Sequence, residues 1–574
     1  SISGNVTSNG MLTFNRSDNI SYGGVISGTG GLNKQGAGLL TLTGDSGGFG
    51  GHTFVNDGTL AIKGALGGTL DVLAGGRLQG NGDIGATDGM GTTVVAGTIA
   101  PGNSIGTLTV NGNYVQLPGS TYEVEIAPAG VSDRIVATGL ADIQGGRVSV
   151  IAAGGAYTPG SRYTILTAND GLTGRFDTLA QGLPRINLGL AYDLNNVYLD
   201  ILRFCDIAGT RNQCAGGSGA ESLGPGNPIY SAIVDLSDQD SARRAFNKLS
   251  GEGHASVKGV MIEDSRFVRE AVSDRMRQAF SATGAQATGL AGQAIQHSPA
   301  TGRTFWSRAF GSFGHRDGDG NATRIGRNIG GVFLGGDVLI ADKFLLGVAT
   351  GYSHSFYNVN QLSTSSSDNY HISLYGATQW GPLGLRLGSA YAWHDLETNR
   401  NIAFAGFSDH AKGNYTAHTA QVFGEVGYGL PFDMVSLEPF ARIAYVNLDA
   451  NSFQERGGPA ALRSPKDNQG TAYTTVGLNA AKTFSSADRM TTTLRGTLGW
   501  RHAFGDRTPL STFAFAGGSS FATAGVPIAG DAIVISGGLD VNIIKAATLG
   551  IYYNGQVLHH IVDNGVRANL SWKF

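Results

Sequence analysis

The sequence Gly565–Phe574, GVRANLSWKF, alternates with a period of two. Its apolar side chains fall on one face, and small, polar and basic side chains fall on the other; the apolar positions are Val566, Ala568, Leu570, Trp572 and Phe574. The first face suits lipid, with aromatic residues near its end, and the second suits a wet lumen. The chain has no apolar stretch long enough for a membrane-spanning helix. The segment therefore predicts a strand of a transmembrane β-barrel.

The composition agrees with a β architecture that contains many tight turns. Glycine accounts for 90 of the 574 residues, without a collagen period, and only 14% of the residues are charged. A mean hydropathy of −0.04 is compatible with a barrel, because only alternate residues of a strand meet lipid. The formal net charge is −3 and no long basic run occurs, so we do not expect a nucleic-acid partner.

From Thr304 onward the pattern predicts about twelve strands of such a barrel. Short turns, such as IADK and QWGPLG, alternate with longer polar segments, such as GHRDGDGNATRIG, NVNQLSTSSSD and LETNRNIAFAGFSDHAKG. An even number of strands puts both ends of the barrel on one side, so a preceding helix must run through the lumen to join an external domain. The expected strand centres are Ala309, Phe333, Ala349, Leu374, Gly388, Phe423, Arg442, Gly477, Leu498, Gly537, Tyr552 and Leu570.

The alternation within strands assigns side chains to the lipid and to the lumen. Leu387, Tyr391 and Trp393 share one face of their strand, and Arg386 and His394 share the other. A soluble barrel would reverse this pattern and pack apolar residues inside. A charge within the span is costly unless it is hydrated or paired, so we place Glu425 and Arg501 in the lumen.

A helix precedes the barrel in residues 231–300. The stretch Ser256–Phe280 has helical spacing, with Val268, Val272 and Met276 on one side. Its charged residues suit a polar channel wall; Arg269, Arg275 and Arg277 are the candidates that would face the lumen residues. Without the barrel, a surface amphipathic helix would be the simpler interpretation.

Residues 1–130 repeat short β-like pieces separated by glycine, at variable spacing. Examples are the GTL elements at Gly58–Leu60, Gly68–Leu70 and Gly106–Leu108. Stacked rungs of a parallel β-helix fit this pattern, because each rung buries its inward side chains against its neighbours. A β-sandwich is the alternative, but it would need longer and more regular strands.

Several segments resemble the monomeric autotransporters of type Va secretion. The resemblance rests on GTIAPGNSIGTLTVNGNY, PGSRYTILTANDGLTGRFDTL, LSGEGHAS, QVFGEVGY, GWRHAFGD and the aromatic C-terminal strand. It implies an all-β chain: a right-handed parallel β-helix stem, then an α-helix threading a 12-stranded antiparallel barrel. The implied divisions are a passenger fragment (1–130), an autochaperone cap (131–202), a linker (203–230), the pore helix region (231–300) and the translocator (301–574).

The resemblance also implies a function and its partners. The barrel would lie in the Gram-negative outer membrane and secrete its own passenger to the cell surface. Its last strand, with Val566, Leu570, Trp572 and Phe574, would be the signal read by the barrel-assembly machinery, with periplasmic chaperones as further partners. The cap would fold around Tyr163, Ile165, Leu166, Leu172 and Phe176. The alternative is a surface adhesin whose stem itself binds host-cell or bacterial ligands.

The close pair Cys205 and Cys214 predicts a small disulfide loop in a cell-envelope protein. Two free thiols are the alternative, and no second pair completes a tetrahedral metal site. The chain opens on SISGNVTSNG, with neither a basic start nor an apolar core, so we expect N-terminal material including a signal peptide to precede it.

No catalytic constellation is evident, so we predict no enzyme and no cofactor or metal. GDSGG at Gly44–Gly48 matches the string around a serine-protease nucleophile, but that chemistry also needs a histidine base and an orienting aspartate. The only nearby histidine is His52. Asp317, Asp319 and Asn321 lack the glutamate of an EF-hand and are expected to form a solvated loop. Because Ser256–Phe280 contains no asparagine, we predict no cleavage at asparagine inside the barrel.

Overall fold

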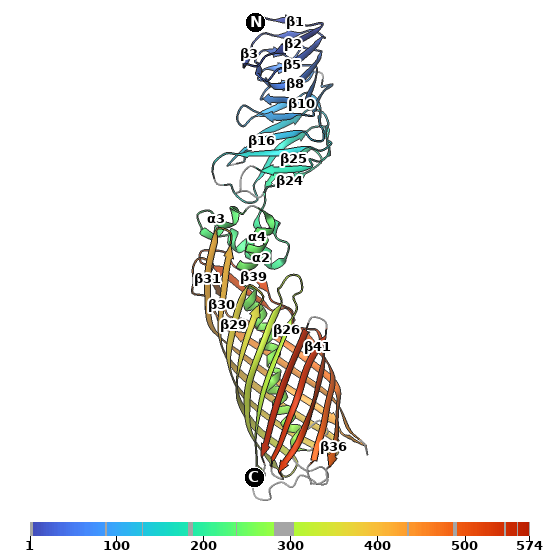
Figure 1. Cartoon of the computed structure of the whole chain (residues 1–574), viewed down its shortest axis with the longest axis vertical. Helices are drawn as coiled ribbons and strands as arrows, with labels where there is room; N and C mark the ends of the chain where they lie inside the picture. Colours follow the sequence, from blue (N-terminus) through green and yellow to red (C-terminus); the bar gives the residue numbers. More distant parts are fainter. Residues whose placement is uncertain are drawn as a thin grey trace. The chain divides into compact units, whose positions relative to one another are not determined.

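The computed structural model describes residues 4–86, 89–128, 130–155, 157–181, 188–236, 238–280, 303–432, 435–485, 491–544, 547–558 and 561–572. These residues form two compact units (Figure 1). The first comprises Ser1–Ile207 with Ile233–Gln239, and the second comprises Ala208–Ala232 with Asp240–Phe574.

The first unit stacks short parallel strands on three faces. One face contains β2 (Met11–Asn15), β5 (Gly31–Gln35), β8 (His52–Ile62), β10 (Thr69–Gly80), β12 (Gly91–Val95), β15 (Gly112–Gln116), β19 (Ala141–Ile143) and β22 (Leu172–Gly174). The second contains β3 (Ile20–Tyr22), β6 (Leu39–Leu42), the far halves of β8 and β10, β13 (Thr98–Pro101), β16 (Thr121–Ala127), β20 (Arg147–Ala152) and β23 (Thr178–Gln181). The third contains β7 (Asp45–Ser46), β9 (Ala65–Leu66), β11 (Asp83–Ile84), β14 (Thr107–Val110), β18 (Arg134–Ala137) and β21 (Arg162–Ala168).

Apolar ladders run through this stack. On the second face the parallel register aligns Leu40, Leu60, Leu78, Ile99, Tyr122 and Val148, all of which are buried. On the third it aligns Leu66, Ile84, Val110, Ala137 and Ala168, also buried. Each rung buries its inward side chains only against its neighbours, as in the predicted β-helix.

The end of the stack lies later than predicted. Parallel pairing continues through β23, well beyond the expected boundary at residue 130. The antiparallel pair β24 (Leu188–Tyr192) and β25 (Asn196–Ile201) then covers β21. The hairpin, rather than the whole stretch 131–202, therefore closes the stack, because antiparallel pairing offers no parallel edge for another rung.

The predicted core of this region is a packed cluster. Tyr163, Ile165, Leu166 and Phe176 are buried, and Leu172 is partly buried against the same cluster. The Tyr163 hydroxyl donates to the Ala127 carbonyl at 3.1 Å, and the Tyr122 and Phe176 rings lie 6.0 Å apart.

The segment predicted to be a linker, 203–230, is mostly helical, so that prediction is wrong. The helices of the chain are α1 (Phe204–Ile207), α2 (Arg211–Glu221), α3 (Pro228–Val234), α4 (Gln239–Leu249), α5 (Glu252–Asp264) and α6 (Arg266–Ala279). Thr210 caps α2 by accepting a hydrogen bond from Gln213 N at 3.2 Å. The glycines of α2 permit close packing: a side chain at Gly216 would meet the Phe246 carbonyl, and one at Gly219 would meet the Phe521 ring.

Two further features concern these helices. Cys205 and Cys214 are disulfide-bonded, as the spacing predicts. Among the described residues, no helix combines the length and the apolar character that crossing a lipid bilayer requires.

In the described part of the second unit, twelve long antiparallel strands close into a barrel. They are β26 (Arg303–Arg316), β27 (Ile325–Ile340), β28 (Phe344–Val359), β29 (Ser363–Trp380), β30 (Leu383–Phe404), β31 (Phe407–Tyr428), β33 (Ser436–Ala450), β36 (Asp467–Ser485), β37 (Thr491–Gly505), β40 (Asp531–Ile544), β41 (Ala547–Leu558) and β42 (Ile561–Trp572). Pairing of β26 with β42 closes the ring, and every predicted strand centre lies on its own strand. Phe305 pairs with Trp572, so the first strand starts and the last strand ends on the same side.

Two predicted external loops are strands instead. NVNQLSTSSSD and LETNRNIAFAGFSDHAKG continue β28–β29 and β30–β31, which turn only at residues 360–362 and 405–406. Ser363, Ser365 and Ser367 are buried at alternate positions there. The inward side chains of these strand ends are therefore polar, which is why hydropathy alone suggests a loop. A four-stranded sheet of β34 (Phe453–Gln454), β35 (Leu462–Ser464), β38 (Leu510–Phe515) and β39 (Phe521–Ala524) forms from the two longest connections at the same end.

The lipid and lumen assignments are confirmed in the strands tested. Leu387, Leu498 and Trp500 are each at least 49% exposed on the outer wall, whereas Arg386 and Arg501 are buried inside. The apolar face thus points outward, opposite to the arrangement in a soluble barrel.

Candidate functional site

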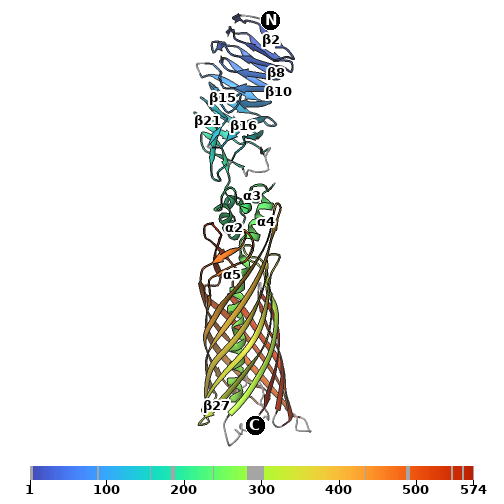
Figure 2. The same ribbon diagram turned by 90° about the vertical axis from the view of Figure 1, so that its left-hand side faces the viewer.

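The helices α5 and α6 lie inside the barrel, as Figures 1 and 2 show from two directions. α5 starts among the external connections, where the Thr323 amide donates to Glu252, and α6 reaches Asp337, close to the opposite turn at residues 341–343. The helix breaks at Ser265, whose carbonyl accepts a hydrogen bond from Gln421 Nε2 of the wall at 2.8 Å. The chain before the barrel therefore passes through the lumen, as the even strand number requires.

The densest contact between helix and wall surrounds Glu425 of β31. Arg277 of α6 donates to its two carboxylate oxygens at 2.8 and 2.5 Å, and Arg386 of β30 donates to Oε1 at 2.7 Å. Arg442 also pairs with Glu425, and Arg386 reaches Glu438 at 2.9 Å. Three guanidinium groups surround the Glu425 carboxylate, which offsets the cost of burying its charge.

A second contact lies near the end of α6. Arg275 donates to both oxygens of Asp337 at 2.6 and 2.7 Å, a bidentate pair that fixes geometry as well as charge. Tyr375 donates to the same carboxylate at 2.8 Å and accepts from Trp306 Nε1 at 2.8 Å. Strands β26, β27 and β29 thus position the partner of one helix residue.

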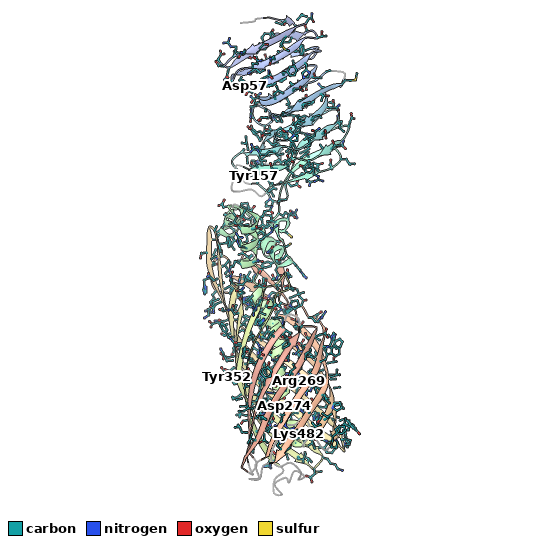
Figure 3. The ribbon with its side chains drawn as sticks, turned by 45° about the vertical axis from the view of Figure 1, so that its right-hand side comes forward. Asp57, Tyr157, Arg269, Asp274, Tyr352 and Lys482 are labelled. Atoms are coloured by element: carbon teal, nitrogen blue, oxygen red, sulfur yellow. The ribbon has the colours of Figure 1, made fainter. Side chains whose placement is uncertain are left out.

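The acidic residues of the helices meet arginines of the wall. Asp274, labelled in Figure 3, pairs with Arg308 and Arg567 at 2.8 Å each. Further pairs join Glu263 with Arg316, and Asp264 with Arg327. The helix therefore contributes both acidic and basic partners to the wall, whereas the predicted arginines alone would contribute only positive charge.

The structure places all five predicted lumen residues inside the barrel. Arg275, Arg277 and Glu425 form the pairs above. Arg269, labelled in Figure 3, donates to Gln421 Oε1 at 2.5 Å rather than to an acid, and Arg501 lies 3.5 Å from Glu263. The sequence reasoning missed wall partners such as Arg308, Asp337 and Asp563; their inward parity within each strand was the available signal.

The external mouth is closed by contacts that the sequence did not indicate. His254 of α5 lies 2.8 Å from Glu455 Oε1, and Arg400 donates to Oε2 of the same buried carboxylate at 2.6 Å. Asn212 of α2, fully buried, donates to the Ala524 carbonyl at 2.8 Å and accepts from the Ala524 amide at 2.9 Å. The supposed linker is therefore part of the seal.

The predicted assembly signal is only partly described. Val566 lies on the outer wall and is 56% exposed. Leu570 and Trp572 lie on β42, but their side chains are not among those described, and Phe574 lies outside the described residues.

The serine of the GDSGG motif lies in the core of the stacked rungs. Ser46 is 1% exposed, and its hydroxyl accepts a hydrogen bond from the Ile26 amide at 2.9 Å. His52 lies on another strand and pairs with Asp71 at 3.0 Å. In the external loop, Asp319 accepts from the amides of Asn321 and Ala322. Within the described ranges, no cluster of His, Cys, Asp or Glu could hold a metal ion.

Residues 305–554 match the family described as Autotransporter beta-domain, and this range covers β26 to most of β41. The barrel is an autotransporter β-domain. It is thus an outer-membrane translocator domain of the Gram-negative type.

Relatives extend the similarity of this chain beyond the barrel. Two proteins of Serratia marcescens, both described as "Extracellular serine protease", are 34% and 30% identical over 609 residues, which cover 96% of this chain and 57% of each relative. The chain therefore spans little more than half the length of these relatives. "Adhesin BmaC autotransporter" of Brucella suis biovar 1 (strain 1330) is 39% identical over 119 residues, covering 21% of this chain and 3% of the adhesin.

Among solved structures, the translocator domain of autotransporter NalP from Neisseria meningitidis matches with a TM-score of 0.43 and 15% identity. The match covers 56% of this chain and 98% of that one. The β domain of the Bordetella autotransporter BrkA matches with a TM-score of 0.37 and 16% identity, covering 48% and 100% of the two chains.

Proposed function

We propose that the barrel exports the stacked β segment of the same chain, residues 4–201, as passenger and displays it on the cell surface. The supporting observation is the course of α5 and α6 through the lumen. Because β26 starts on the side where β42 ends, the chain before α5 leaves the barrel at the opposite, external mouth. The ion pairs of Arg275 and Arg277 hold the helix in that position.

Folding of the passenger supplies the direction of transport in this proposal. The region nearest the barrel would emerge first, and the cluster around Tyr163, Ile165, Leu166, Leu172 and Phe176 would fold on the β24–β25 hairpin. Each further rung then has a finished edge to pair with, so stacking proceeds without ATP and resists sliding back. This is the autochaperone role that we assign to the cluster.

Assembly of the barrel is assigned to its last strand. The outward row that contains Val566, Leu570, Trp572 and Phe574 would be read by the barrel-assembly machinery, after periplasmic chaperones deliver the chain. Deletion of the last three residues should therefore block insertion.

The activity of the whole protein follows from its relatives in this proposal. The Serratia relatives are named as extracellular serine proteases, which stands against the prediction of no enzyme. We assign protease activity to sequence beyond the stem and barrel, because Ser46 is buried and bonded within its rung. The alternative, an adhesive stem, draws support from the shorter similarity to the Brucella adhesin.

Protease shaving of intact cells tests the proposal. The chain carries an epitope tag before Ser1 and is expressed with and without its last three residues. We expect surface exposure of the tag only with the intact C-terminus. A tag that stays protected in both chains would show that the β segment is periplasmic and would overturn the proposal.

A further inference from the structure

Four histidines share one level on the outer wall of the barrel. His315, His354, His418 and His502 lie in the outward rows of β26, β28, β31 and β37. Each histidine lies about ten residues along its strand from the opposite edge of the apolar band, the edge away from the external loops. At about 3.3 Å per residue and a strand tilt of about 40°, ten residues span about 25 Å, which is the height of that band. The reference residues at that edge are Phe305, Phe344, Tyr428 and Thr492, the last paired with Phe484.

Each of these histidines has an aspartate beside it. His354, His418 and His502 stand directly opposite Asp368, Asp449 and Asp531 in the antiparallel register. The ring nitrogen Nδ1 lies 2.9 Å from Asp368 in the first pair and 2.8 Å from Asp531 in the third. His315 Nε2 lies 3.8 Å from Asp317, which follows the end of β26 in the external connection.

Aromatic residues accompany the pairs. Tyr352 donates to Asp368 at 2.6 Å, and Trp500 Nε1 donates to Asp531 at 3.0 Å. Tyr391 stacks on His418 with ring centroids 5.9 Å apart. Tyrosine and tryptophan at this height mark the boundary between hydrocarbon and headgroups, so the four pairs stand at the level of the external headgroups. Near the opposite edge the exposed cations include Arg303 and Lys343.

We propose that these histidine–aspartate pairs form a belt that binds the phosphate groups of surrounding lipid headgroups when the histidines are protonated. At His354 and His502 the aspartate lies at Nδ1, so it holds the Nδ1–H of the neutral ring and leaves Nε2 as an acceptor. Protonation converts Nε2 into a donor for an anionic oxygen, and a charge-assisted bond to phosphate follows. With a neutral ring the pair offers phosphate no cationic donor from the histidine, so the belt binds headgroups more tightly when the histidines are protonated.

The strand on the other side of each histidine adds no charged group at two of the pairs. It places Gly330 opposite His354, and Thr474 opposite His502. The groups around the four rings are Asp368, Tyr352 and Tyr370 at His354; Asp449, with Lys466 at 3.8 Å from it, Tyr391 and Trp393 at His418; Asp531, Trp500 and Phe504 at His502, with Arg507 near Asp531; and Asp317, with Arg324 at 3.7 Å from it, at His315.

Quenching of tryptophan fluorescence by brominated lipid measures the proposed binding. The full chain is reconstituted in phosphatidylcholine bilayers containing brominated phosphatidylglycerol, whose phosphodiester keeps its charge from pH 5.5 to 7.5. Trp393 and Trp500 face the lipid at the belt and report on contact. We expect the preference for phosphatidylglycerol to rise at pH 5.5, by about fivefold for each protonated site.

Two variants decide the origin of that preference. His354→Gln and His502→Gln should each lose part of the rise, and either one carries the test if the other does not fold. His410→Gln, on the exposed hairpin beyond the band, should behave like the original chain. A preference that does not change with pH, or one that both variants retain, would overturn the proposal. So would a preference that requires Mg²⁺ and survives in the histidine variants, because it would assign binding to aspartates bridged by the cation.

Discussion

Arg277 of the lumen helix and Glu425 of the barrel wall form an ion pair with a shortest distance of 2.5 Å, and their side chains are only 5% and 2% exposed. The pair joins helix α6 to strand β31 of the closed barrel. It is therefore one of the contacts through which the lumen helix and the closed wall stabilise one another.

Replacement of Glu425 by glutamine should loosen the lumen helix. Three guanidinium groups would lose their shared carboxylate, and an uncompensated buried charge costs about 3–5 kcal/mol. We expect a lower free energy of unfolding, measured by urea titration of the full chain in detergent, and larger current fluctuations in planar bilayers.

The matched control for this change is Glu397→Gln. Glu397 pairs with Lys412 at 2.7 Å, but the two side chains are 45% and 43% exposed, so the loss should stay below about 1 kcal/mol. Equal losses in the two variants would contradict the role assigned to Glu425.

A methyl group at Gly525 should also displace the lumen helix. An added Cβ there would overlap the backbone of Ala255 and Ser256 in α5, and backbone cannot rotate away as a side chain can. We expect Gly525→Ala to destabilise the folded barrel by about 1–3 kcal/mol. Gly537→Ala serves as control, because its Cβ would meet no atom within 4 Å. Unchanged urea midpoints for both would contradict the close fit.

The barrel could be predicted from sequence because its signal is local. Alternation at Leu387, Tyr391 and Trp393 reports directly on which face meets lipid, and each strand can be analysed alone. The same parity placed Glu425 and Arg501 in the lumen. It did not identify the partners of lumen residues, because pairing depends on how the helix lies against strands that are distant in sequence, as in Arg275 and Asp337.

Glycine and polar residues give a misleading sequence signal where they serve packing. Gly216 and Gly219 suggested a linker but permit α2 to approach Phe246 and Phe521. Ser363, Ser365 and Ser367 suggested a loop but face a polar interior. Composition alone does not distinguish a solvated segment from one that lines a wet, crowded lumen.

Stability of the stem should depend on pH through Asp133. Burial raises the pKa of this carboxyl to about 6, although the amides of Glu125 and Gly106 each donate to it at 2.8 Å. The folded stem then binds a proton more readily than the unfolded chain, so this contribution to stability is present below about pH 4 and is lost as pH rises to about 6. The expected change is about 1–2 kcal/mol, allowing for some solvent near the group.

Proteolysis of the full chain across pH 4 to 7 measures this effect on the stem. Asp133→Asn removes the titrating group and should flatten the profile. A variant that keeps the original pH dependence would assign the effect to another group.

Phe176 should be needed for folding of the stem but not of the barrel. Its ring is 7% exposed and contacts the Tyr122 ring, so Phe176→Ser should cost about 3–5 kcal/mol. Displayed stems should become sensitive to protease, while the barrel keeps its heat-dependent mobility on gels. Leu194→Ser is the control, since Leu194 is 84% exposed. Resistant stems in both variants would contradict the role of the cluster.

Ser46 should contribute to the stability of the stem and to no covalent chemistry. Its hydroxyl accepts the Ile26 amide at 2.9 Å and is buried from solvent, while His52 pairs with Asp71. A fluorophosphonate probe, which labels activated serines, should leave Ser46 unlabelled in the folded chain. Ser46→Ala should lower the stability of the stem by about 1 kcal/mol, because the Ile26 amide loses its acceptor. Labelling that disappears in Ser46→Ala would instead make GDSGG a nucleophile site, and the protease activity named in the Serratia relatives would then have a candidate within the stem itself.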